Sequence, residues 1–160
     1  MNEIQIEKSE RAQRAMKLFL EGYNCSQAVV LAFADMIDMD QSMLLKLSSS
    51  FGGGMGRLRE VCGSVSGMFI VAGVLYGYDE PKAPEKKAEH YTRIQELAAA
   101  FREQNGSIVC RELLGLDKKG PDSPIPEART EEYYKKRPCK ELIGMSAAIL
   151  ENYIKDNKVD

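Results

Sequence analysis

The stretch Asn24–Met36, NCSQAVVLAFADM, contains the clearest helix signal in the chain. Asn24 is followed three residues later by Gln27, the arrangement of a capping box, in which each side chain bonds the backbone N–H of the other residue. Apolar residues then recur at the i, i+3, i+4 spacing of one helix face. That face consists of Cys25, Ala28, Val29, Ala32, Phe33 and Met36. We therefore predict a helix whose buried face begins with Cys25 in its first turn.

Helix start and stop signals divide the rest of the chain into similar segments. Gly22 ends the segment before this stretch, and Gly77 ends a long apolar segment after it. Pro84 begins a polar segment that closes at Gly106, and Pro138 begins the last segment. We expect the further helices at about 7–21, 40–50, 62–76, 84–105, 107–115 and 138–150, with a Pro-rich surface connection at 116–130.

The chain shows no strand pair with a hairpin signal, no internal repeat and no second domain. Its 160 residues are enough for one hydrophobic core without covalent or metal staples. The predicted fold is therefore all-α, a single-domain compact helical bundle of about six to seven helices over residues 1–160 with short flexible ends.

Charge and hydropathy limit the classes of function. The formal net charge of -2 and the pI near 5.6 argue against a nucleic-acid-binding surface. The N-terminal residues are charged and amphipathic without the apolar core of a signal peptide, so we expect a cytoplasmic location, where stable structural disulfides are rare. The longest uncharged run, Val61–Tyr78, is rich in Gly and Ser and reads as a buried helix rather than a membrane span.

Four cysteines, Cys25, Cys62, Cys110 and Cys139, each fall in the first turn of an expected helix and begin its apolar face. Cys110 lies three residues after Ser107, which we expect to cap its helix, and Cys139 follows Pro138. A helix N-terminus favours thiolate over thiol, whereas burial opposes it. Basic residues close in sequence would support the thiolate, and these are Arg57, Arg59, Arg111 and Lys140.

Simple core packing is the alternative reading, because free cysteine is among the most buried residue types. No two cysteines form a CxxC pair, and the single His90 leaves no His/Cys zinc signature. The sequence alone does not say which thiols meet.

The stretch Ser50–Gly67, SFGGGMGRLREVCGSVSG, precedes and contains Cys62. It matches neither a P-loop, which needs a Lys-Ser/Thr pair, nor the GxGxxG dinucleotide fingerprint. Consecutive glycines can curl their N–H groups into an anion-binding nest, although a plain loop is an equal alternative. We expect a positive, sterically open wall beside the thiols, made of Gly53, Gly54, Gly56 and Arg57, which would contact a cofactor or substrate.

These segments resemble the C_GCAxxG_C_C family. CGSVSG, beginning at Cys62, looks like the CGAxxG motif of that family, with Ser64 in place of the usual alanine. GYNCSQAV, GGGMG, GSIVCRELLG and RPCKELI look like its other segments in the same order, so the resemblance extends from about Ala15 to Leu150. The resemblance implies a helical fold and a redox role, with a site formed by Cys25, Cys62, Cys110 and Cys139.

Three functions remain open from the sequence. The first is a thiol-based oxidoreductase that exchanges disulfides or electrons with an unidentified redox partner, either a protein or a small molecule. The second is a zinc or iron–sulfur site with the same four cysteines as metal ligands. The third is a structural or partner-binding helical module with core cysteines. A homo-oligomer packed through the small-residue helix Gly67–Gly77 is a further expectation.

Overall fold

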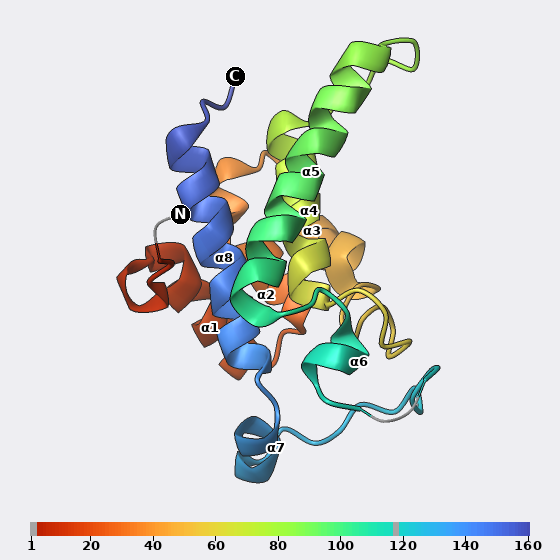
Figure 1. Cartoon of the computed structure of the whole chain (residues 1–160). Coiled ribbons are helices and arrows are strands. Elements are labelled where there is room, and N and C mark those ends of the chain that lie inside the picture. Colours follow the sequence, from red (N-terminus) through yellow and green to blue (C-terminus); the bar gives the residue numbers. More distant parts are fainter. Residues whose placement is uncertain (1–2, 117–118) are drawn as a thin grey trace.

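A computed structural model describes residues 3–116 and 119–160, and these residues form a helical bundle with no strand longer than an isolated bridge (Figure 1). Residues 117 and 118 of the predicted Pro-rich connection lie outside the described residues, as do residues 1 and 2. The elements are η1 (Ile6–Lys8), α1 (Glu10–Leu20), α2 (Cys25–Ala32), η2 (Ala34–Met36), α3 (Gln41–Ser49), α4 (Gly63–Tyr76), α5 (Pro84–Asn105), α6 (Cys110–Leu113), α7 (Glu131–Lys136) and α8 (Cys139–Asp156). The all-α prediction is confirmed.

The capping box at the start of α2 is formed as predicted. The Gln27 N–H donates to the Asn24 side chain at 2.9 Å, and the Asn24 N–H donates to the Gln27 side chain at 3.1 Å. The α-helix ends at Ala32, earlier than the apolar pattern predicts, and the chain continues as η2. Phe33, between the two elements, is fully buried. Four of the six predicted apolar positions are therefore buried, whereas Cys25 and Met36 are half-buried, and the six do not all belong to one helix.

Helices α1, α2, α4 and α8 surround the core, and α5 packs against α4 and α8 (Figure 1). Small residues bring the central helices close together. A Cβ atom added at Gly67 on α4 would lie 2.8 Å from the Ser26 carbonyl oxygen on α2. The fully buried core residues include Ala15, Phe33, Met68 and Ile143, contributed mainly by these helices.

The apolar run 61–78 forms α4, whose N-terminal half is buried from Gly63 to Met68. Within the part of the chain that the structure describes, no helix is both long and apolar enough to cross a membrane. The prediction of a buried helix in this run is confirmed.

Two helix predictions near the C-terminal half need correction. The helix expected at 107–115 is limited to α6, and its N-cap is Val109 rather than Ser107. Val109 forms an antiparallel bridge with Val61, so the chain enters α6 in an extended conformation. Farther along, residues 131–136 form α7, which Thr130 caps by accepting a hydrogen bond from the Tyr133 N–H and which the sequence analysis did not predict.

Candidate functional site

All four cysteines lie at helix N-termini and line one cavity of about 360 Å³. Three of them are the first residues of α2, α6 and α8, and the fourth is the N-cap of α4. The predicted first-turn placement is confirmed, and the structure adds that the four helix starts converge. The four are Cys25, Cys110, Cys139 and Cys62, all of them free thiols.

An antiparallel contact between two loops brings the start of α4 against the start of α6. The Cys62 N–H donates to the Ile108 carbonyl at 2.8 Å, and the Arg111 N–H donates to the Arg59 carbonyl at 3.2 Å. The Val61–Val109 bridge lies between these two hydrogen bonds. This pairing satisfies the backbone of both loops and holds the starts of α4 and α6 in register.

Glycines let the backbone of the glycine loop, residues 50–57, and of α4 approach two of the thiols. Gly54 has φ +68°, and a Cβ atom there would lie 2.5 Å from the Cys110 Cβ. A Cβ atom at Gly63 would lie 2.3 Å from the Cys25 Sγ. Both separations are far below van der Waals contact, so any larger residue would displace the cysteine or the backbone. The triple glycine is therefore part of the wall that holds the thiols.

The predicted wall residues occupy two layers. Gly53, Gly56 and Arg57 line the cavity, whereas Gly54 is buried behind Cys110. Burial raises the pKa of the Cys25 thiol, and a hydrogen bond from the Gly53 N–H partly opposes this increase. Gly53 has φ +75°, a left-handed conformation that glycine adopts without strain. One N–H of the expected nest thus contacts a cysteine sulfur.

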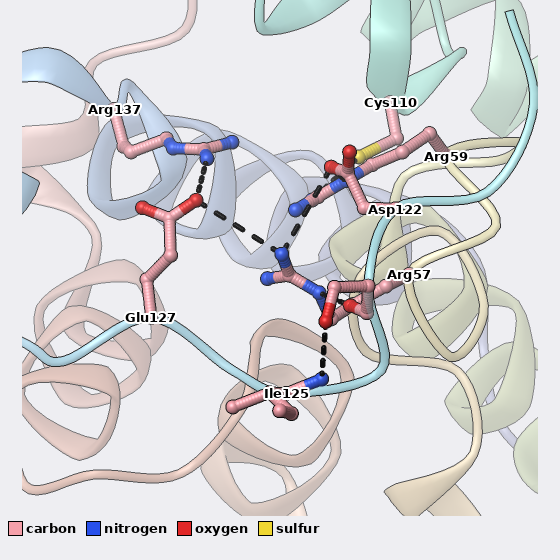
Figure 2. A network of polar contacts seen from close by, with 8 residues as sticks. Arg57, Arg59, Cys110, Asp122, Ile125, Glu127 and Arg137 are labelled. Carbon is pink, nitrogen blue, oxygen red and sulfur yellow. Dashed lines mark hydrogen bonds and ion pairs between the residues drawn. The ribbon is translucent and has the colours of Figure 1, made fainter.

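Arg59, rather than Arg57, is the arginine of this loop that contacts a thiol. Its guanidinium lies 3.6 Å from the Cys110 Sγ and donates to the Asp122 carboxylate at 2.8 Å, as Figure 2 shows. The residue is only 6% exposed and has φ +62°, a conformation that is rare for residues other than glycine. A buried cation beside a sulfur favours its thiolate form. Cys110 is thus the thiol with the strongest cationic contact.

Arg57 points toward the segment that leads into α7. It donates to the Ser123 carbonyl, and its guanidinium lies 4.0 Å from both the Asp122 and the Glu127 carboxylates (Figure 2). Glu127 also forms an ion pair with Arg137. Arg57 therefore anchors this segment over the cavity.

Burial raises the pKa values of the other two thiols, as it does that of Cys25. Burial, together with the nearby Cys25 sulfur, raises the pKa of Cys62 to about 12. Burial, together with the Cys25 and Cys110 sulfurs, raises the pKa of Cys139 to about 12, although Arg137 and Arg59 oppose the increase. Both cysteines are neutral thiols at physiological pH, so neither can start a disulfide exchange by itself.

A short polar chain inside the core ends at Cys62. The Ser146 hydroxyl on α8 donates to the Ser64 hydroxyl at 3.0 Å, and the Ser64 hydroxyl lies 3.1 Å from the Cys62 Sγ. This hydroxyl slightly lowers the pKa of Cys62 against the larger effect of burial. Ser64, the residue that departs from the family motif, therefore adds a polar contact to a thiol.

The sequence analysis missed one wall of the cavity. Residues of the Pro-rich connection and of α7 line it, although this region reads only as a surface segment in the sequence. Hydrophobic periodicity carries no information about irregular segments, and the ion pairs that hold the segment join residues more than 60 positions apart. The lining residues from this region are Pro124, Pro126, Glu127, Arg129 and Tyr133.

The fit of the site to a metal is a separate question. Among the described residues, no group of three or more His, Cys, Asp or Glu side chains is placed to hold a metal ion. The cysteines share a cavity, but their present arrangement is not a ready ligand set. The zinc or iron–sulfur site that the sequence allows therefore stays a prediction, and the spectroscopic arm of the experiment below tests it.

Comparison with known proteins identifies one family. A family model described as "Putative redox-active protein (C_GCAxxG_C_C)" matches residues 23–153, which include all four cysteines. No curated protein and no solved structure matches the chain. The match covers more than half of the chain, and it supports a redox-active role in general terms.

Proposed function

Because the chain belongs to the C_GCAxxG_C_C family, we propose that it is a thiol–disulfide redox protein whose cysteines cycle between dithiol and disulfide. The observation that carries the proposal is the convergence of four helix N-termini, each bearing a cysteine, on one cavity. Core packing alone would not require all four thiols to reach the same cavity.

In the proposed reaction, Cys110 attacks first. Arg59 stabilises its thiolate, and that thiolate attacks one sulfur of a disulfide partner, which releases one partner thiolate and forms a mixed disulfide. Cys25 then attacks the Cys110 sulfur, so an internal disulfide forms and the second partner thiolate leaves. The partner disulfide is reduced to two thiols, the protein dithiol is oxidised, and the two cysteine protons are transferred to the leaving thiolates.

Cys25 is proposed as the second cysteine for two reasons. It is half-buried, and its sulfur already accepts a hydrogen bond from the Gly53 N–H, which helps it to lose a proton. Cys110 is also the neighbouring thiol that most affects its pKa.

Thiol counting before and after oxidation tests the proposal. The reduced protein is treated with a mild disulfide oxidant, its free thiols are titrated, and the oxidised cysteines are mapped by mass spectrometry. We expect the reversible loss of two thiols, a Cys25–Cys110 disulfide, and full recovery after reduction with dithiothreitol. A protein that never forms a reversible internal disulfide would contradict the proposal.

A parallel sample decides between this function and a metal centre. The protein is purified anaerobically from iron- and zinc-replete cells, and its metal content and visible spectrum are measured. We expect less than one metal ion per two chains and no cluster absorption. A stoichiometric metal that is lost in the Cys110→Ser variant would assign the cysteines to metal binding instead.

A further inference from the structure

The cavity is positively charged in an otherwise acidic protein. Its charged lining residues are three arginines, Arg57, Arg59 and Arg129, and one carboxylate, Glu127, whereas the whole chain has a formal net charge of -2. Glu127 is already paired with Arg137 and lies near Arg57. The cavity therefore has more cationic charge than its own carboxylates neutralise.

Arg129 differs from the other two lining arginines, which lie near Asp122 or Glu127. Its guanidinium donates to the carbonyl oxygens of Phe19 and Tyr23, at 2.7 and 3.0 Å, at the end of α1. It lies over the Phe19 ring, with 4.0 Å between the guanidinium carbon and the ring centroid. Among the described residues, no carboxylate forms an ion pair with it. The two carbonyls and the rings of Phe19 and Tyr133 fix the guanidinium in place, but no described carboxylate neutralises its charge.

The other two arginines are occupied. Arg59 donates hydrogen bonds to the Cys110 sulfur and to Asp122. Arg57 donates to the Ser123 carbonyl and lies near the carboxylates of Asp122 and Glu127 (Figure 2). Arg129 is thus the cation in the cavity that remains for a bound ligand. It also comes from the segment that packs beside Tyr133 and Cys139 in the cavity wall.

The sulfur that attacks first lies deep relative to the surface. Cys110 is only 7% exposed, although it lines the cavity. A disulfide fixed in a folded protein could reach such a sulfur only by inserting a loop into the cavity. A low-molecular-weight disulfide can enter a cavity of about 360 Å³ directly.

We propose that the redox partner is a small anionic disulfide, one that carries carboxylates, and that Arg129 binds one of these carboxylates. This inference rests on the proposed thiol–disulfide function and names its substrate class. The bound carboxylate positions the substrate disulfide for attack by the Cys110 thiolate. The substrate is reduced to two carboxylate-bearing thiols as the Cys25–Cys110 disulfide forms, so the electrons balance without another reactant.

Three disulfides that differ mainly in charge test the proposal. These are 3,3′-dithiodipropionate, which is anionic, 2-hydroxyethyl disulfide, which is neutral, and cystamine, which is cationic. Each second-order rate constant with the reduced protein at pH 7.5 is divided by the rate constant with an uncharged model thiol, which removes differences in intrinsic reactivity. We expect the normalised rate to be roughly tenfold or more higher for the anionic than for the neutral disulfide. The difference should shrink as the salt concentration increases.

In the Arg129→Gln variant this preference should disappear, so the ratio of its normalised rates with the anionic and the neutral disulfide should fall to about one. Arg14→Gln is the matched control, because it removes the same charge from a half-exposed side chain outside the cavity. Arg129→Lys keeps the charge and should retain part of the preference. The Arg129→Lys variant still tests the role of the charge if Arg129→Gln disturbs the packing at the end of α1.

Equal normalised rates for the three disulfides would overturn the inference and leave the proposed function intact. A preference for anions that persists in Arg129→Gln would also overturn the assigned role of Arg129. If none of the three reagents oxidises the protein to a form with an internal disulfide, the proposed function itself is wrong.

Discussion

Two regions of the cavity hold the same functional group in opposite surroundings. In one, the Cys110 sulfur lies 3.6 Å from the buried Arg59 guanidinium. In the other, Cys62 and Cys139 lie where burial raises their pKa values to about 12. A cationic hydrogen-bond donor favours the thiolate, and removal from water favours the thiol. The comparison shows that four similar helix starts need not give four similar cysteines.

Replacing a cysteine in each region gives the largest expected difference. Cys110→Ser should lower the rate of internal disulfide formation at pH 7.5 at least about 100-fold, because it removes the one cysteine sulfur to which we assign the first attack and which contacts Arg59. Cys139→Ser is the matched control, and its rate should stay within about twofold of the wild type. Quenched-flow alkylation followed by mass spectrometry gives both rates. Equal losses in the two variants would abolish the distinction between the regions.

The contact between Gly54 and Cys110 is tested by a pair of glycine variants. Gly54 and Gly56 both have positive φ, but a Cβ atom at Gly56 would have open space around it. Gly54→Ala should therefore lower the free energy of unfolding by about 1–3 kcal/mol more than Gly56→Ala. Urea denaturation followed by circular dichroism measures both values.

A β-branched residue at Gly54 tests the same contact with a larger side chain. Gly54→Val should slow the reaction of the cysteines more than it reduces helicity, because the added atoms press on Cys110 rather than on a helix. If disulfide formation in this variant proceeds at the wild-type rate, the glycine loop is only a connection.

Two arginines with nearly the same backbone conformation test the cationic contact. Arg57 and Arg59 have φ values of 68° and 62°, but only Arg59 contacts the Cys110 sulfur. Asparagine tolerates this conformation. Arg59→Asn should slow Cys110 alkylation at pH 7 by about tenfold, because it removes the guanidinium that contacts the sulfur. Arg57→Asn should change it much less, and the reverse order would show that Arg57 supports the thiolate.

The raised pKa of Cys62 should make the free energy of unfolding depend on pH. This is the smallest of the expected effects. The pKa of Cys62 is raised from 9.0 to about 12 in the folded protein. The folded state therefore binds this proton more tightly, and the resulting stability is complete below pH 9 and is lost as the pH rises toward 12. From pH 8 to 9.5 this loss is on the order of 1 kcal/mol.

The Cys62→Ser variant isolates that contribution, because all other titrating groups are shared with the wild type. The variant's free energy of unfolding should fall less steeply than that of the wild type over this pH range. Parallel pH profiles would mean that Cys62 ionises as readily in the folded state as in the unfolded chain.

Sequence signals that act within one helix predict this molecule well. Asn24 and Gln27 mark the start of α2, and the apolar face that begins with Cys25 predicts an inward thiol. The signals fail where distant segments decide the conformation. The positive φ of Arg59 and its ion pair with Asp122, 63 residues away, depend on tertiary contacts that no local pattern encodes. Sequence reasoning therefore named the four cysteines and both arginines, but it placed Arg57, and not Arg59, in the wall beside the thiols.

The Pro-rich connection that lines the cavity is a second case in which distant contacts decide the structure. Arg129 enters the cavity because it is bound to the end of α1, 106 and 110 residues earlier in the chain. The proline residues around it indicate a surface connection, and this description is correct for the backbone. It does not indicate that one side of the connection closes a cavity of thiols.

Competitive alkylation of the four cysteines in the reduced wild-type protein tests the central claim most directly. Light and heavy forms of iodoacetamide are added in sequence at pH 7, and mass spectrometry gives the rate for each cysteine. The account predicts that Cys110 reacts first, that Cys25 follows, and that Cys62 and Cys139 react slowest. Fastest alkylation at Cys62 or Cys139, or equal rates at all four cysteines, would contradict it.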